Sequence, residues 1–115
     1  MSGGPHTKNR NGHRYLLVRF LTEDPAPAQA IEDAVVRSIE HMFGKFGAAE
    51  MKVRMIGVDP VGDKAALRCA LRSVEKLRAA VAMISRVNAQ PAAAMVIRSS
   101  GTIRALRVRI QRRQR

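Results

Sequence analysis

The sequence predicts one α+β sandwich, in which two helices cover one face of a four-stranded antiparallel sheet. Three observations support this prediction. Four short segments are apolar runs or alternate apolar with basic or small residues, as strands do, and two longer segments repeat apolar residues at helical spacing. Their order is strand, helix, strand, strand, helix, strand, which is the split βαβ plan. With 115 residues, of which 46% are hydrophobic, the chain is long enough for one stable core.

The first half of the chain contains a leader, a strand and a helix. Residues 1–12 are polar and rich in glycine, which predicts a flexible leader. Residues 14–21 form a dense apolar run of strand length, and the two prolines that follow suit the entrance of a helix. Apolar residues then recur at helical spacing over 31–46, including Phe46. Gly44 and Gly47 predict where this helix ends, because a left-handed cap residue is usually glycine.

The second half is predicted to contain three strands and the second helix. Residues 51–58 alternate apolar and basic side chains, and residues 64–71 resume the alternation after a turn rich in aspartate, proline and glycine. Ser73 suits the N-cap of the second helix, which extends to about residue 87. Residues 93–99 are predicted to form the last strand.

The segment after the last strand is ambiguous. Thr102 suits the N-cap of a short C-terminal helix, which we predict, although the apolar residues that follow also alternate with arginine as they do in a strand. The chain then divides into the leader 1–12, a single ferredoxin-like βαββαβ domain over 13–110, and a basic C-terminal tail over 111–115.

The charge of the chain is strongly positive and unevenly distributed. The chain has 21 lysines and arginines against 9 aspartates and glutamates, and its formal net charge is +12. Glu75 is the last carboxylate, so residues 76–115 carry ten basic residues and no acidic one. Because a solvated surface usually mixes both signs, this asymmetry favours a polyanionic partner, nucleic acid first among them. The alternative is a basic tail that only aids solubility.

Alternation along the strands predicts that basic residues gather on the face of the sheet away from the helices. Arg19, Arg54, Arg68 and Arg98 fall at outward positions of the four strands, whereas Met95 and Ile97 are assigned to the helix side. Aromatic residues make up only 3% of the chain, so stacking of unpaired bases on this face is disfavoured and phosphate contacts are favoured. Ordinary solvated arginines remain the alternative.

Several other classes of site are disfavoured. A single cysteine excludes an internal disulfide framework and a cysteine zinc cluster, and the three histidines lack metal-like spacing. No apolar run approaches the roughly 18 residues of a membrane span, so no membrane partner is expected. Cys69 falls at an inward strand position, which predicts a buried, inert thiol. Asp59 and Asp63 suit a turn more than a cation site. We therefore predict no catalytic residues and no metal ligands.

Four short motifs carry a resemblance to a known family. They are Arg-Tyr-Leu-Leu-Val at 14–18, Met-Phe-Gly at 42–44, Leu-Arg-Cys at 67–69 and Ser-Gly-Thr-Ile at 100–103. In this order they resemble the ribonuclease P protein component 2 family of archaea and eukaryotes, over residues 13–106. The Ser-Gly-Thr-Ile element followed by basic residues is the most specific of the four.

The resemblance implies a fold, a function and a set of partners. Members of that family are α/β sandwiches of the ferredoxin-like kind and are non-catalytic subunits of ribonuclease P, the ribonucleoprotein that removes 5′ leaders from precursor tRNA. The implied partners are ribonuclease P RNA, ribonuclease P protein component 3 and, through the complex, precursor tRNA. The catalyst is the RNA, and its magnesium is expected on the RNA, so the protein itself binds no cofactor. The implied location is cytoplasmic in an archaeal host and nuclear or nucleolar in a eukaryotic one.

The predicted RNA contacts are arginines in or near the matched motifs, and their role is to neutralise and position phosphates of the RNA's catalytic domain. They are Arg14, Arg68, Arg98, Arg104 and Arg107. Structural roles are predicted for the residues of the most specific motif, Ser100, Gly101, Thr102 and Ile103, with a backbone bend at the glycine and a helix cap at the threonine. Leu17 and Leu21, on the otherwise basic face, are predicted to mark a protein interface.

Three alternatives share the predicted topology. A ribosomal protein or another protein that binds structured RNA would have the same charge and element order without the Ser-Gly-Thr-Ile element. A small phosphatase of the acylphosphatase type needs an arginine-bearing anion loop after the first strand, where this chain has the acidic Thr-Glu-Asp-Pro. A regulatory domain for a small molecule gives no reason for a charge of +12.

Overall fold

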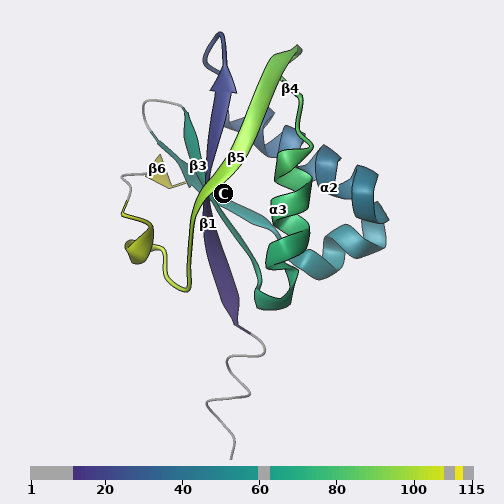
Figure 1. The fold of residues 1–115 in the computed structure, drawn as a ribbon, viewed down its shortest axis with the longest axis vertical. Coiled ribbons are helices and arrows are strands. Elements are labelled where there is room, and N and C mark those ends of the chain that lie inside the picture. The colour runs from purple at the N-terminus through teal and green to yellow at the C-terminus, as the bar shows by residue number, and fades with distance from the viewer. Residues whose placement is uncertain (1–11, 60–62, 108–110, 113–115) are drawn as a thin grey trace, which may run out of the picture.

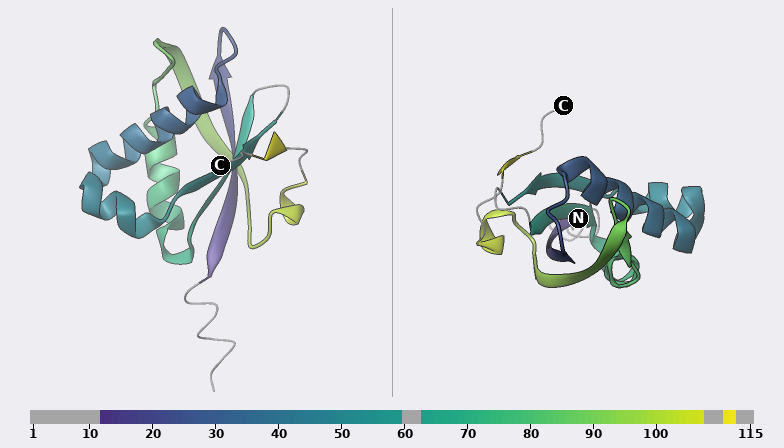
Figure 2. Two further views of the ribbon diagram at one scale, coloured as in Figure 1. Left: turned by 180° about the vertical axis from the view of Figure 1, so that it is seen from behind. Right: turned by 90° about the horizontal axis from the view of Figure 1, so that it is seen from above.

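A computed structural model describes residues 12–59, 63–107 and 111–112. The strands form one antiparallel sheet in the order β4-β5-β1-β3-β2-β6, and the two helices lie together on one face of it (Figures 1 and 2). The elements are β1 (His13–Thr22), α2 (Ala28–Met51), β2 (Arg54–Val58), β3 (Lys64–Ala70), a 3₁₀ turn (Leu71–Ser73), α3 (Val74–Ala82), β4 (Arg86–Val87), β5 (Gln90–Ser100), the 3₁₀ turn η2 (Arg104–Leu106) and β6 (Gln111–Arg112).

The central four strands confirm the predicted ferredoxin-like fold. Their order β5-β1-β3-β2 places the first and third strands of the βαββαβ plan in the middle of the sheet. The main core lies between the sheet and the helices, and its members follow the predicted periods of two along strands and three to four along helices. They include Leu16, Val18 and Phe20 of β1, Leu67 and Cys69 of β3, Ile31, Val35 and Ile39 of α2, and Leu77 and Val81 of α3.

The first helix continues beyond the glycines that were predicted to end it. Gly44 does leave the helical conformation, with φ 74° and ψ 173°, a region open almost only to glycine. Helical residues then resume on a new axis as far as Met51, which is buried. This break shifts the phase of the apolar pattern, so Phe46 is 91% exposed instead of lying in the core. Because Met51 stays helical, the second strand begins at Arg54 and not at residue 51.

The last predicted strand is the second arm of a hairpin. The short strand β4 precedes it, and the two-residue turn between them, Asn88 and Ala89, has positive φ at both positions. A bulge interrupts the pairing of β5 with β1, so that Val18 faces Val96 and Leu17 faces Arg98. The predicted inward positions of Met95 and Ile97 are therefore wrong: Val96 packs on the helix side, and the other two are 46% and 40% exposed.

The C-terminal segment forms a single turn and a strand, not a longer helix. Thr102 accepts a hydrogen bond from the backbone N–H of Ala105 at 3.2 Å, as a capping threonine does, but the 3₁₀ turn η2 ends at Leu106. Gln111 and Arg112 then pair with β2 as the edge strand β6. The sheet thus extends into the residues assigned to the basic tail. Residues 1–11 of the predicted leader lie outside the described residues, whereas the carbonyl of Gly12 accepts a hydrogen bond from the N–H of Leu71 at 2.9 Å.

Within the part of the chain that the structure describes, no helix has the length and apolar character needed to cross a membrane.

Candidate functional site

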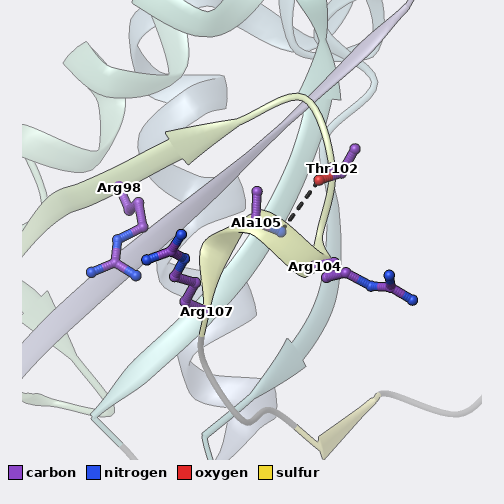
Figure 3. A pocket seen from close by; sticks show the side chains of 5 residues that line it. All are labelled: Arg98, Thr102, Arg104, Ala105 and Arg107. Carbon is purple, nitrogen blue, oxygen red and sulfur yellow. Dashed lines mark hydrogen bonds between the residues drawn. The ribbon is translucent and has the colours of Figure 1, made fainter.

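A pocket lined by three arginines lies where β5 ends and the chain turns back over the sheet. We call it the arginine pocket. Its volume is about 540 Å³, and it is lined by Arg98, Thr102, Arg104, Ala105 and Arg107. Figure 3 shows Arg98 and Arg107 extending toward one another, while Arg104 extends from the other side of the turn. The pocket is on the face of the sheet away from the helices, which we call the far face, because Arg98 lies opposite the far-face residue Leu17.

Hydrogen bonds hold the turn of the arginine pocket in one conformation. The Nη1 of Arg98 donates to the carbonyl of Leu106 at 2.6 Å, which joins the strand to the turn. The backbone N–H of Arg107 donates to the carbonyl of Arg104 at 3.1 Å, and Arg107 takes a left-handed conformation with φ 56°. Arg98 lines the pocket and also bonds the backbone of the turn at Leu106. Its side chain therefore positions the turn as well as contributing a charge.

An apolar contact seats the same turn on the sheet. Leu106 is fully buried against Leu17 of β1 and Ala66 of β3, and Ile103 packs beside them. This small second core lies on the far face, so Leu17 is covered by the chain's own C-terminal segment. The prediction that Leu17 marks an interface with another protein is therefore wrong. Leu21, the other residue of that prediction, is 44% exposed.

The charges of the arginine pocket have no carboxylate partner within the described ranges. The ion pairs in the described ranges lie elsewhere: Arg19 and Lys64 pair with Asp63, at 3.4 Å and 3.2 Å, and Arg78 pairs with Glu75 at 3.9 Å. Arg19 is thus partly neutralised. Guanidinium groups that share a pocket repel one another unless an anion lies between them, and phosphate oxygens match their planar donors. The pocket is therefore suited to bind an anion of phosphate type.

The other two predicted arginines lie outside the pocket. Arg68 is on the far face, opposite Tyr15 on β1 and Arg54 on β2. Arg14 lies opposite Cys69, a residue of the main core, and thus belongs by alternation to the helix side of the sheet. Its Nη1 would stand 3.5 Å from a Cβ placed on Gly101. Of the five predicted arginines, the structure brings together Arg98, Arg104 and Arg107.

The Ser-Gly-Thr-Ile motif builds the backbone of this site. The Oγ of Ser100 accepts a hydrogen bond from the N–H of Thr102 at 3.2 Å, Gly101 lies in a bend, and Ile103 packs in the second core. The sequence pattern does not reveal Leu106 as the buried anchor of the turn. Its signal is an apolar residue three positions after Ile103 in an otherwise basic segment, a spacing that also occurs in a helix.

Cys69 is a residue of the main core and does not line the arginine pocket. The side chain is fully buried, and burial raises the pKa of its thiol from 9.0 to about 11, an effect that the nearby charge of Arg14 partly opposes. The thiol is therefore protonated at neutral pH and is a poor nucleophile. Among the residues that the structure describes, no three histidine, cysteine, aspartate or glutamate side chains lie close enough together to hold a metal ion.

The raised pKa of Cys69 predicts a specific pH dependence of stability. The folded state holds the thiol proton more tightly than the unfolded state, so the free energy of unfolding is expected to fall as the pH rises from 9.0 to about 11. At most about 2.7 kcal/mol is lost, since each pKa unit corresponds to about 1.36 kcal/mol. Urea unfolding of the wild type and of Cys69→Ala, at a pH below and a pH above this range, measures the change in the free energy of unfolding. An equal pH dependence of the two proteins would contradict the assignment.

The fold and the pocket together define a class of protein. It is a small, basic α+β sandwich with an arginine pocket on the far face of its sheet. More particularly, the chain belongs to the Rpp14/Pop5 family, whose model matches residues 14–111. That match includes all of β1 except His13 at one end, and the whole arginine pocket and the first residue of β6 at the other.

Named relatives agree with this membership, and a solved structure shares the fold. The chain is 30% identical to ribonuclease P protein component 2 of Methanosarcina acetivorans over 95 residues. This alignment covers 83% of this chain and 70% of the relative. It is 26% identical over 98 residues to the protein of the same name from Pyrococcus horikoshii, covering 85% of this chain and 82% of that one. A chain in the cryo-electron microscopy structure of yeast ribonuclease MRP has a similar fold, with a TM-score of 0.63 and 11% identity over 81% of this chain and 76% of that chain.

Proposed function

We propose that this protein is a non-catalytic subunit of ribonuclease P that stabilises the folded, active form of the RNA in the removal of 5′ leaders from precursor tRNA. The observation that carries the proposal is the arginine pocket, which is lined by three arginines that have no carboxylate partner in the described residues. Family membership supports it, since relatives along most of the chain are named ribonuclease P protein component 2.

The proposed mechanism is electrostatic. Folding of a large RNA brings phosphates together, and diffuse counterions reduce their repulsion only at a cost in ion entropy. Arginines held in place by the turn replace some of those counterions and release them to solvent, which favours the compact RNA. The catalytic magnesium is bound by the RNA in this proposal, and the protein contributes no catalytic group. Its protein partner is component 3, which acts with it on the RNA's catalytic domain.

Reconstitution tests the proposal. Ribonuclease P RNA and component 3 from the same host are mixed with precursor tRNA, with and without this protein, and cleavage is followed as a function of magnesium concentration. The protein is expected to lower the magnesium concentration needed for cleavage, because its arginines take over part of the counterion role. A variant in which glutamine replaces Arg104 and Arg107 is the control and is expected to lower it less.

The outcomes separate this proposal from its main alternative. If the protein binds the RNA but never lowers the magnesium requirement, it is a structured-RNA-binding protein of another kind, such as a ribosomal protein. If it does not bind the RNA at all, the arginine pocket serves another anion and the proposed function is wrong.

A further inference from the structure

We propose that Arg54 and Arg68 form a second phosphate-binding site on the far face, separate from the arginine pocket, which takes another backbone phosphate of the same RNA. This inference rests on the proposed function and extends its footprint to Arg54, a residue on β2. The carrying observation is the register of the sheet, in which Arg54 and Arg68 are direct cross-strand partners.

Direct cross-strand partners have their side chains on one face and within contact distance of each other. Arg68 alternates with the core residue Leu67, so it points to the far face, and Arg54 shares that face. Like charges placed opposite each other destabilise a sheet. An arrangement of this kind is favourable when an anion binds between the two guanidinium groups and bonds to both.

Nothing in the described part of the chain neutralises this pair. None of the ion pairs there involves Arg54 or Arg68. The Nε of Arg68 is buried and has no hydrogen-bond partner, while the side chain as a whole is only partly buried. Tyr15 lies opposite Arg68 on its other side and supplies a phenol in the same row. The row therefore has donors in excess and no acceptor of opposite charge.

The position of the pair makes it a separate site and not an extension of the arginine pocket. Arg98 is on β5 and Arg68 is on β3, with β1 between them, so the two strands are about 10 Å apart. The row of Arg98 contains Leu17 and Ala66, which Leu106 covers. The row of Arg54 and Arg68 is the next one along that face toward the start of β1. An RNA backbone that enters the pocket meets the pair at a different phosphate.

The test uses two variants at one position. Arg54→Gln removes one charge and is expected to reduce the salt slope of binding to a ribonuclease P RNA transcript by about 0.7 to 0.9, the contribution of one phosphate. Arg54→Glu places a carboxylate opposite Arg68 and is expected to weaken binding further, because this carboxylate pairs with Arg68 and repels the phosphate. Both variants are expected to melt at the same temperature as the wild type or higher, since they relieve the repulsion between the two arginines.

The controls separate this inference from the proposed function. Arg37→Gln removes an exposed arginine from α2, on the other side of the sheet, and is expected to leave the salt slope unchanged. If Arg104→Gln weakens binding and neither Arg54 variant does, the proposed function stands and the second site is wrong. If none of these variants affects RNA binding, both are wrong. A lower melting temperature of Arg54→Gln would assign Arg54 a structural role and overturn the inference.

Discussion

Replacing Leu106 by alanine is expected to lower the free energy of unfolding by about 2 to 4 kcal/mol, the usual cost of truncating a fully buried leucine. Leu106 is completely buried against Leu17 and Ala66 although it belongs to a turn of only three residues. Its side chain is the apolar anchor that holds this turn on the sheet. Chemical denaturation measures the loss. The same variant is expected to bind RNA more weakly, because the turn that carries the arginine pocket is no longer held on the sheet.

The matched control is Ile97→Ala. Ile97 is an aliphatic residue near the same site but 40% exposed, so its truncation is expected to cost well under half as much. If Leu106→Ala unfolds at the wild-type denaturant concentration and binds RNA normally, the turn is held by its hydrogen bonds alone, and the second core has no part in forming the site.

Replacing Arg104 and Arg107 together by glutamine is expected to weaken RNA binding by about ten- to a hundredfold, because two contacts of roughly 1 kcal/mol each are lost and about 1.4 kcal/mol is tenfold. Both side chains are exposed and line the arginine pocket, and neither has a carboxylate partner in the described residues. Two lost phosphate contacts also reduce the salt slope by about 1.4 to 1.8. Titration of the RNA at several salt concentrations measures both effects.

The free energy of unfolding of this double variant is expected to stay close to that of the wild type, since both side chains are exposed. Arg98→Ala differs, because its Nη1 bonds the carbonyl of Leu106; it is expected to lose stability as well as affinity. A double variant that keeps both the affinity and the salt slope would remove the arginine pocket from the RNA contact surface.

Most of the secondary structure could be predicted from local patterns, and the errors have local physical causes. The period of two along β1 and β3 and the apolar repeat in α2 follow directly from which face each residue must bury. The errors arose where one residue changed the phase of a pattern. Gly44 broke α2 and turned Phe46 to solvent, and the bulge in β5 exchanged the faces of Met95 and Val96. A sequence pattern does not show whether its period continues through such a point.

The candidate site was predictable in composition but not in assembly. The absence of any carboxylate after Glu75 pointed to the C-terminal arginines, and three of the five chosen do line one pocket. Arg14 was chosen from its motif, yet it lies opposite Cys69 on the other side of the sheet. Arg54, in contrast, is only an outward strand residue in the sequence pattern, and the register of the sheet places it against Arg68.

The ferredoxin-like plan, the basic character of the far face and the shortage of aromatic residues follow from residue type and spacing along the chain, so they can be predicted without coordinates. That the C-terminal segment folds back on the sheet, buries Leu106 on Leu17 and thereby forms the arginine pocket is seen only in the folded chain. Burial and cross-strand register join residues far apart in sequence, and local patterns do not contain that information. A leucine in a basic segment has no preferred partner until the surface it covers exists.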